Sequence, residues 1–174
     1  MNIITGFEKV NEIINECITM ELTSDGILSD VEMFINTYFS EGQVEEPCIW
    51  LTQHPTTVEK NADISHTLLL KTPFEFDCGV YAVEIEDANT LSQNLCNRVI
   101  VSILKNWQRI QASKVPNERM IRNITLETYS PIGYVPVTGK SDKVPLTGVI
   151  LNVYHIINWQ LCCQQITEGE SNNG

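Results

Sequence analysis

The chain has 174 residues, of which 43% are hydrophobic, and it carries a formal net charge of −11 at pH 7. These values are typical of one folded domain with a core of its own and exclude a chain that is disordered in bulk. No apolar run approaches the roughly 20 residues that a membrane-spanning helix needs, and the N-terminus lacks the basic and apolar regions of a signal peptide. We therefore expect a protein that is made and used in a cytoplasm, with one domain over residues 1–163 and a polar tail over 164–174.

Most of the cysteines fall at core-facing positions of apolar segments, where a thiol behaves as a small hydrophobic group. This usage favours a reduced compartment. No two pairs of cysteines stand at the spacing of zinc ligands, so the adjacent pair Cys162 and Cys163 is interpreted as structural or incidental. The six cysteines are Cys17, Cys48, Cys78, Cys96, Cys162 and Cys163.

The charge is unevenly distributed along the chain. Residues 1–46 hold ten acidic residues against the single Lys9, whereas residues 98–122 hold six basic residues against the single Glu118. One molecule therefore presents an acidic region and a basic region, which suits contact with copies of itself or with a neighbouring ring. Scattered, solvated surface charge is an equally good explanation for any single residue.

The first segments predict helices and one short strand. Thr5 to Glu8 has the spacing of a capping box, and an apolar stripe follows, so we expect a helix over 5–20. A second capping pattern and helically spaced apolar residues predict a short helix over 29–38, although the β-formers in 34–39 leave a strand as the alternative. Residues 48–51 predict a short apolar strand, and residues 54–63 predict an exposed loop.

The centre of the chain predicts a long strand followed by a long helix. Apolar residues occupy alternate positions over 66–82, which is typical of a strand, or of a hairpin, with one buried face. The inward positions would be Leu68, Leu70, Phe74, Phe76, Cys78 and Val80. Pro73 lies in the middle of this run and predicts an edge, a bulge or a bend there. Asp87 and Asn89 offer helix-capping oxygens, and apolar residues at helical spacing predict about five turns that end near Trp107. The inward positions would be Leu91, Leu95, Cys96, Val99, Ile100, Ile103, Leu104 and Trp107.

The last third predicts strands around a segment rich in proline and glycine. Residues 108–118 are interpreted as a basic linker, and residues 120–126 as a strand. Six prolines and glycines in 130–148 exclude a helix and predict a long projecting loop or a two-stranded arm. A closing strand follows over 149–159. The fold class is therefore α+β, with a mostly antiparallel sheet and helices packed on one face.

No set of residues in the sequence predicts catalysis, and none predicts a cofactor or a metal. The three histidines lack ligand partners at suitable spacing, and we expect His155 to be a hydrogen-bonded core residue. Glu84, Glu86 and Asp87 are explained by helix capping. The sequence contains no glycine-rich phosphate loop and no nucleophile motif.

Several segments, taken together in this order, resemble the tail terminator, or tail-completion, proteins of long-tailed bacterial viruses. The resemblance covers most of the chain and rests on element order and spacing. It comprises the N-terminal helix, the short strand Pro47 to Leu51, the extended run Leu68 to Ala82, the apolar helix Leu91 to Trp107 and the closing strand Gly148 to Trp159. The segments 21–46 and 130–148 depart from the family pattern.

The resemblance implies a structural virion protein, assembled in the host cytoplasm, without enzymatic activity. It would form a ring of six copies that ends the tail tube and joins it to the neck. Its partners would be itself, the tail tube protein and neck or connector proteins, with DNA passing through the lumen unbound. The alternatives are a head-completion or stopper connector, a small metal-dependent enzyme that uses Glu84, Glu86, Asp87 and His155, or a cytoplasmic binding module. The candidate interface residues are Arg98, Lys105, Arg109, Arg119, Arg122, Tyr134, Lys140 and Lys143.

Overall fold

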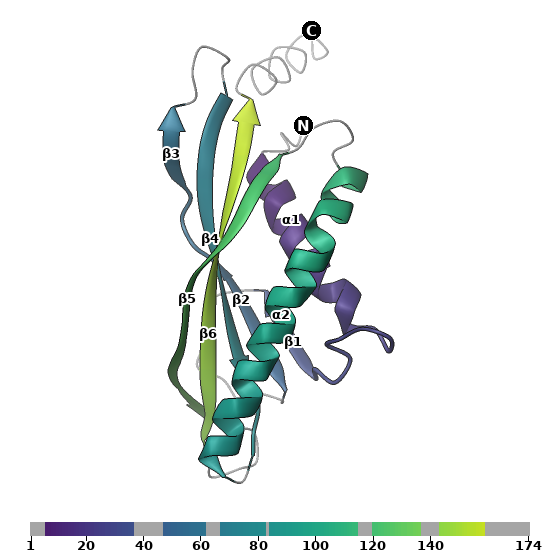
Figure 1. Ribbon diagram of the computed structural model, residues 1–174, viewed down its shortest axis with the longest axis vertical. Helices are drawn as coiled ribbons and strands as arrows, with labels where there is room; N and C mark the ends of the chain where they lie inside the picture. Colours follow the sequence, from purple (N-terminus) through teal and green to yellow (C-terminus); the bar gives the residue numbers. More distant parts are fainter. Residues whose placement is uncertain are drawn as a thin grey trace, which may run out of the picture.

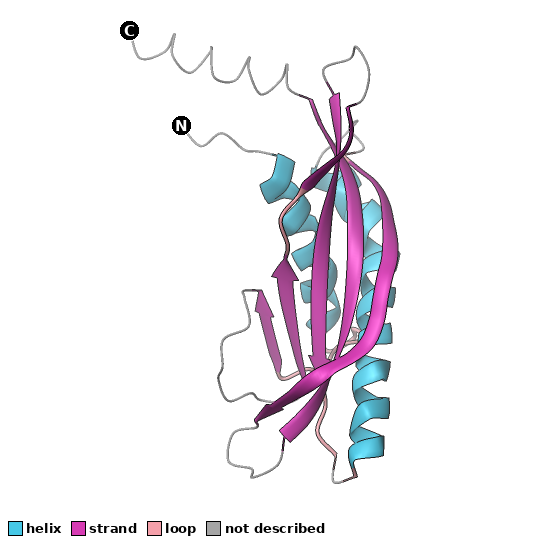
Figure 2. Ribbon diagram, turned by 90° about the vertical axis from the view of Figure 1, so that its left-hand side faces the viewer, coloured by secondary structure: helices cyan, strands magenta, loops and turns pink. Residues whose placement is uncertain are grey.

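The computed structural model describes residues 6–36, 47–61, 67–82, 84–114, 120–136 and 143–158. One layer is a sheet of six strands, and two helices cover one of its faces (Figure 1). Figure 2 shows the same two layers from the side of the sheet, with the helices behind it. This arrangement confirms the predicted α+β fold.

Helices and strands do not alternate along the chain. The strands come in two consecutive groups, and the long helix lies between these groups. The helices are α1 (Gly6–Thr19), the short 3-10 turn η1 (Met20–Leu22) and α2 (Ile85–Lys114). The strands are β1 (Met33–Asn36), β2 (Cys48–Gln53), β3 (Thr57–Asn61), β4 (Thr67–Gly79), β5 (Ile121–Pro136) and β6 (Lys143–Asn158). The sheet order is β1-β2-β4-β6-β5, and β3 also pairs with β4. The β1–β2 pair is parallel, and the other strand pairs of the described residues are antiparallel.

The predicted N-terminal helix is present as α1, and its apolar stripe is buried against α2 and the sheet. The acidic side chains lie on the other side of the helix, as the spacing predicts. The buried residues of this stripe are Val10, Ile13, Ile14, Cys17 and Ile18.

Two of the predictions between the first helix and the long strand are wrong. The described residues 29–36 do not form the predicted short helix: the four residues of β1 take the strand alternative and pair with β2. Phe34 packs against the main core while Met33 and Ile35 pack against Trp50 on the opposite face of the sheet. A strand is favoured over a helix here, because alternate residues of this β-forming run are buried on opposite faces of the sheet.

The predicted loop over 54–63 contains the strand β3. It pairs with the first residues of β4, which would otherwise present unpaired backbone groups at an edge. Thr57, Val58 and Glu59 are all exposed, so β3 has no apolar alternation from which a strand could be predicted.

The long strand is confirmed as β4, and it lies inside the sheet. Leu70, Phe74, Phe76 and Cys78 are buried on the helix side, whereas Leu68 and Val80, also predicted inward, are only half-buried. Pro73 lies where the neighbouring chain bends from β2 into β3, and its carbonyl accepts a hydrogen bond from the His54 amide at 2.9 Å. The amide and the carbonyl of one strand residue point the same way, so the missing N–H of Pro73 faces this bend and costs no bond to β6.

The helix α2 is longer than the five turns that the sequence predicts. It has 30 residues and continues to Lys114, through most of the segment interpreted as a linker. Asp87 and Asn89 therefore lie inside its first turns instead of preceding it. Small and polar residues form much of the inward face, which includes Ala88, Ser92, Ser102, Asn106 and Gln111.

Leu91 and Leu104, predicted to point inward from this helix, are exposed by 43% and 52%. The inward face lies instead on the side of Leu95, Val99 and Ile103, which are completely buried. The apolar spacing of the sequence therefore predicted the helix correctly. The predicted inward face is rotated about the helix axis relative to the observed one.

Over its described residues, the segment rich in proline and glycine forms two paired strands, which is the second of the two predicted alternatives. β5 and β6 form one long hairpin, with Pro136 opposite Lys143 at the end of the described pairing. β4 ends at Gly79, opposite Leu146, so the last pairs of the hairpin extend past β4. The polar tail 164–174 and the cysteine pair Cys162 and Cys163 lie outside the described residues.

Candidate assembly interface

Arg98 of α2 is tied to the segment that follows α1. Its two terminal nitrogens donate to the two carboxylate oxygens of Asp30, at 2.5 and 3.1 Å, and one of them also donates to the Ile27 carbonyl at 2.9 Å. The hydrogen bond from Arg98 holds the pKa of Asp30 below its usual value. Two parallel bonds fix the orientation of the pair as well as its distance.

Lys105 and Asn106, one to two helical turns further along, hold Glu21. This carboxylate is only 5% exposed, and one of its oxygens accepts from Asn106 Nδ2 at 2.7 Å and from Lys105 Nζ at 3.0 Å. Its other oxygen accepts from the Ile27 amide at 3.2 Å. The bonds from Asn106 and then Lys105 lower the pKa of Glu21, so the buried carboxylate stays ionised at neutral pH.

The remaining cations of α2 also face the N-terminal region. Lys114 Nζ lies 2.8 Å from a carboxylate oxygen of Glu16 and 3.6 Å from one of Glu12, and the pKa of Lys114 is raised by its bond to Glu16. Arg109 is exposed and lies 3.5 Å from Met20 Sδ. Much of the opposite charge noted in the sequence is thus brought together inside one molecule. Arg98 and Lys105 already have acidic partners in their own chain.

Apart from Arg98, which lies in the middle of α2, the described interface candidates fall into two groups towards opposite ends of the molecule. Arg122 is exposed at the start of β5, next to the C-terminal end of α2, where Gln111 Nε2 donates to the Ile121 carbonyl. Tyr134 and Lys143 lie in the hairpin near the N-terminal end of α2, with Tyr134 opposite Pro145. Arg119 and Lys140 are outside the described residues. The structure therefore separates a group near the end of α2 from a group in the hairpin.

The hairpin end is anchored to α2 at its base. Ser92 Oγ donates to the Pro145 carbonyl at 3.1 Å and accepts from the Val80 amide at 3.0 Å. Cys96 Sγ donates to the Thr147 carbonyl at 2.9 Å. These contacts tie three elements together just before the hairpin leaves the sheet. We call Tyr134–Pro136 with Lys143–Pro145 the arm.

A second polar group lies on the face of the sheet away from the helices. His54 Nε2 lies 2.6 Å from Glu75 Oε2, and Asn152 Nδ2 donates to Glu127 Oε2 at 2.5 Å, with Lys71 Nζ 3.6 Å from the same oxygen. Asp77 is on this face and only 8% exposed, and its Oδ1 has no hydrogen-bond partner.

Burial, reinforced by the charge of Glu75, raises the pKa of Asp77 to about 7. Asp77 is not among the residues predicted from the sequence, although its position on the outward alternation of β4, beside Trp50 on β2, was a usable signal.

The residues of the enzyme alternative do not meet. His155 is buried opposite Leu70, and its Nε2 lies 2.8 Å from Thr72 Oγ1, which agrees with the expected core histidine. Burial lowers its pKa to about 4. Glu84, Glu86 and Asp87 are exposed at the other end of the sheet, beyond Gly79 and Leu146. At about 3.3 Å per residue, the nine residues of β6 that separate Leu146 from His155 span roughly 30 Å.

The described residues contain no group of three or more histidine, cysteine or acidic side chains arranged to hold a metal ion. Within the same residues, no helix has the length and the apolar character needed to cross a membrane. No protein-family model matches the sequence, and the search of curated proteins finds no match to it.

Proposed function

We propose that this chain is a structural subunit of a phage tail, of which six copies close into a ring that ends the tail tube and joins it to the neck. The observation that carries the proposal is the arm. It extends past β4 from a base that three hydrogen bonds tie to α2 and the chain after β4. A stiff body with an anchored extension is suited to reaching a neighbouring subunit or ring.

The two ends of the sheet support a head-to-tail contact. β5 forms one edge of the sheet, and β1 and β3 lie at the other. β1 and β5 differ in length and direction of pairing: β1 has four residues and pairs in parallel, whereas β5 has sixteen and pairs antiparallel. A closed ring of identical subunits needs two different surfaces on each copy. The opposite ends of this sheet provide two such surfaces.

The charge of the chain supports passage of DNA through such a ring. A net charge of −11 on each subunit repels phosphates, so a lumen lined by six copies would not retain the nucleic acid. Three of the four cations of α2 do not offset this charge, because Arg98, Lys105 and Lys114 are paired with carboxylates of the same chain. The proposal assigns the chain no reaction of its own.

The proposal is tested by producing the chain together with the tail tube protein encoded in the same genome and imaging the tubes by electron microscopy. We expect a ring of this chain at one end of each tube. Bare tube ends, with the chain recovered separately at every salt concentration, would contradict it. A stopper or head-completion protein would instead bind the portal complex of the same genome and leave tube ends free, so the same preparation distinguishes the two.

A further inference from the structure

The outward face of α2 has an uncharged stripe that no described element covers. Its residues follow the alternating three- and four-residue spacing of a helix seam, and all of them are exposed. Val101 and Leu104 at its centre are each 52% exposed. Figure 1 shows this helix running along the molecule in front of the sheet. The stripe consists of Thr90, Asn94, Asn97, Val101, Leu104 and Gln108.

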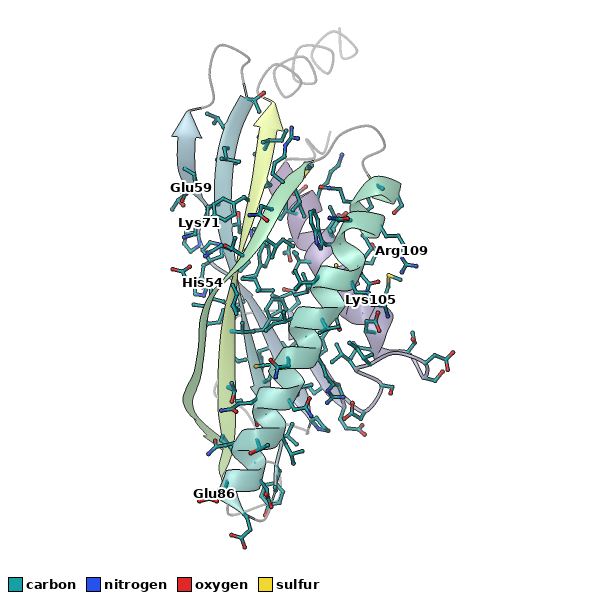
Figure 3. The ribbon with its side chains drawn as sticks, viewed as in Figure 1. His54, Glu59, Lys71, Glu86, Lys105 and Arg109 are labelled. Carbon is teal, nitrogen blue, oxygen red and sulfur yellow. The ribbon has the colours of Figure 1, made fainter. Side chains whose placement is uncertain are left out.

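A stripe without charge is unusual on the solvent side of a helix in so acidic a chain. Solvent-facing helix positions normally carry charged side chains. Here the charges are placed at the two ends instead: Glu84, Glu86 and Asp87 are exposed at the start of α2, and Lys105 and Arg109 are exposed in its second half. Figure 3 shows Glu86 at one end of the helix and Lys105 and Arg109 towards the other.

This charge distribution favours one partner and one orientation. When two copies of α2 pair in antiparallel fashion about Val101, the acidic first turn of each helix lies towards the C-terminal half of the other, where Arg109 is exposed and has no acidic partner among the described residues. The two helix dipoles also align favourably. A parallel pair would bring acidic ends together and basic ends together. Each copy carries a net charge of −11, so two copies repel each other. Contact through the uncharged stripe keeps this repulsion lowest.

We propose that two copies of this chain pair through the stripe of α2, antiparallel, with Val101 and Leu104 at the centre of the contact. The pairing is isologous, so it is separate from the head-to-tail contact of a ring and does not depend on the tail assignment. Asn94 favours this register, because an asparagine in a helix seam needs a matching polar partner and Gln108 lies opposite it.

Light scattering on the purified chain, with two variants, tests the pairing. We expect a dimer, and we expect Val101→Glu with Leu104→Glu to weaken it by at least tenfold in dissociation constant. Val58→Glu is the matched control, because Val58 is 57% exposed on β3, away from α2, and should leave the dimer unchanged. A monomeric parent chain would overturn the proposal. An equal loss in the Val58 control would also overturn it.

Disulfide trapping then tests the orientation, in a background where Cys162 and Cys163 are replaced by serine. Val101→Cys should form a cross-linked dimer on mild oxidation, and Val58→Cys should not. Chains with Asn94→Cys mixed with chains with Gln108→Cys should cross-link to each other, because an antiparallel pair brings these positions together. Cross-linking of Asn94→Cys only to itself would show a parallel pair and overturn the proposal.

Discussion

Glu21 is the residue on which the N-terminal third of the chain depends most. Its carboxylate is buried, and it accepts hydrogen bonds from α2 and from the Ile27 amide, so it joins the end of η1, the following turn and the long helix. A buried carboxylate with three donors is stabilising only while all three are in place. The turn itself is tight, since a Cβ at Gly26 would lie 2.1 Å from the Glu21 carbonyl oxygen.

Replacing Glu21 by glutamine should therefore destabilise the protein by about 1–3 kcal/mol, because a neutral amide cannot accept from Asn106, Lys105 and Ile27 together. Chemical denaturation measures the effect. Glu12→Gln is the control: Glu12 is 59% exposed and lies 3.6 Å from Lys114, so its loss should cost well under 1 kcal/mol. Equal effects of the two variants would show that Glu21 does not hold the N-terminal segment.

Asp77 and His155 give the protein opposing pH dependences. The folded pKa of Asp77 is raised from 3.8 to about 7, so its contribution to stability is complete below pH 3.8 and is lost as the pH rises through 7. The folded pKa of His155 is lowered from 6.5 to about 4, so the unfolded chain binds the extra proton and stability is lost as the pH falls from 6.5 to 4. Between pH 4 and 6.5 the two effects partly cancel.

Asp77→Asn should raise the free energy of unfolding at pH 7.5 by about 1–3 kcal/mol, because it removes a buried charge with an unpaired oxygen. It should also make the loss of stability on acidification from pH 6.5 to 4 steeper, since His155 then acts alone. Urea melts over this range measure both effects. Asp25→Asn, at an exposed turn, is the control. A variant with the parent's pH profile would show that Asp77 is ionised in the fold.

At the scale of elements, sequence patterns predict those parts whose burial is regular. α1 and β4 follow their apolar spacing because each buries one face against the core. The elements missed by the sequence are held by contacts that no local pattern encodes. β3 is an exposed strand held by pairing to β4, and α2 extends to Lys114 because Ile110 and Gln111 are buried. Gln111 also exchanges two hydrogen bonds with the backbone of Ile121.

The candidate interface shows the same limit. The sequence indicates that opposite charges lie in two segments, but spacing alone does not decide whether these charges meet within one molecule or between two. Asp30 and Arg98 are 68 residues apart, and only the packing of α1 on α2 brings them together. The arm, by contrast, was one of two predicted alternatives, because prolines and glycines exclude a helix there.

The arm should be separable from the body. We expect that replacing residues 135–144 by Asn-Gly leaves the fold intact and changes the melting temperature by only a few degrees, because a two-residue turn can close the hairpin at Tyr134 and Pro145. Attachment to the tube end should be lost. Circular dichroism and the tube preparation measure the two effects. A shortened chain that still caps tubes would show that the arm is not a contact.

Ser92 is the matched test of the arm's base. Ser92→Ala removes the donor to Pro145 and the acceptor of the Val80 amide, both in buried or half-buried surroundings, and should cost about 1–3 kcal/mol. Ser113→Ala removes only a local hydrogen bond, from Ser113 Oγ to the Ile110 carbonyl at 2.8 Å on the exposed side of α2, and should cost much less. Similar values for both variants in chemical denaturation would argue against an anchored hairpin.

At the scale of the whole molecule, the described residues offer four surfaces for contact with other chains: the two edges of the sheet, the arm and the uncharged stripe of α2. The ring that we propose uses the two edges and the arm, and the pairing through α2 uses the stripe. The two assemblies are therefore independent. A chain with Val101→Glu and Leu104→Glu should still cap tubes, and a chain without the arm should still form dimers.

The most direct test of the ring is the number and arrangement of copies at a tube end, determined by cryo-electron microscopy of the tubes formed with this chain. The account predicts six copies, each of 19.7 kDa, in head-to-tail contact around an open lumen, with the arm touching a neighbouring subunit or the tube. Tube ends that carry no density for this chain, while it stays a separate monomer or dimer in the same sample, would contradict it.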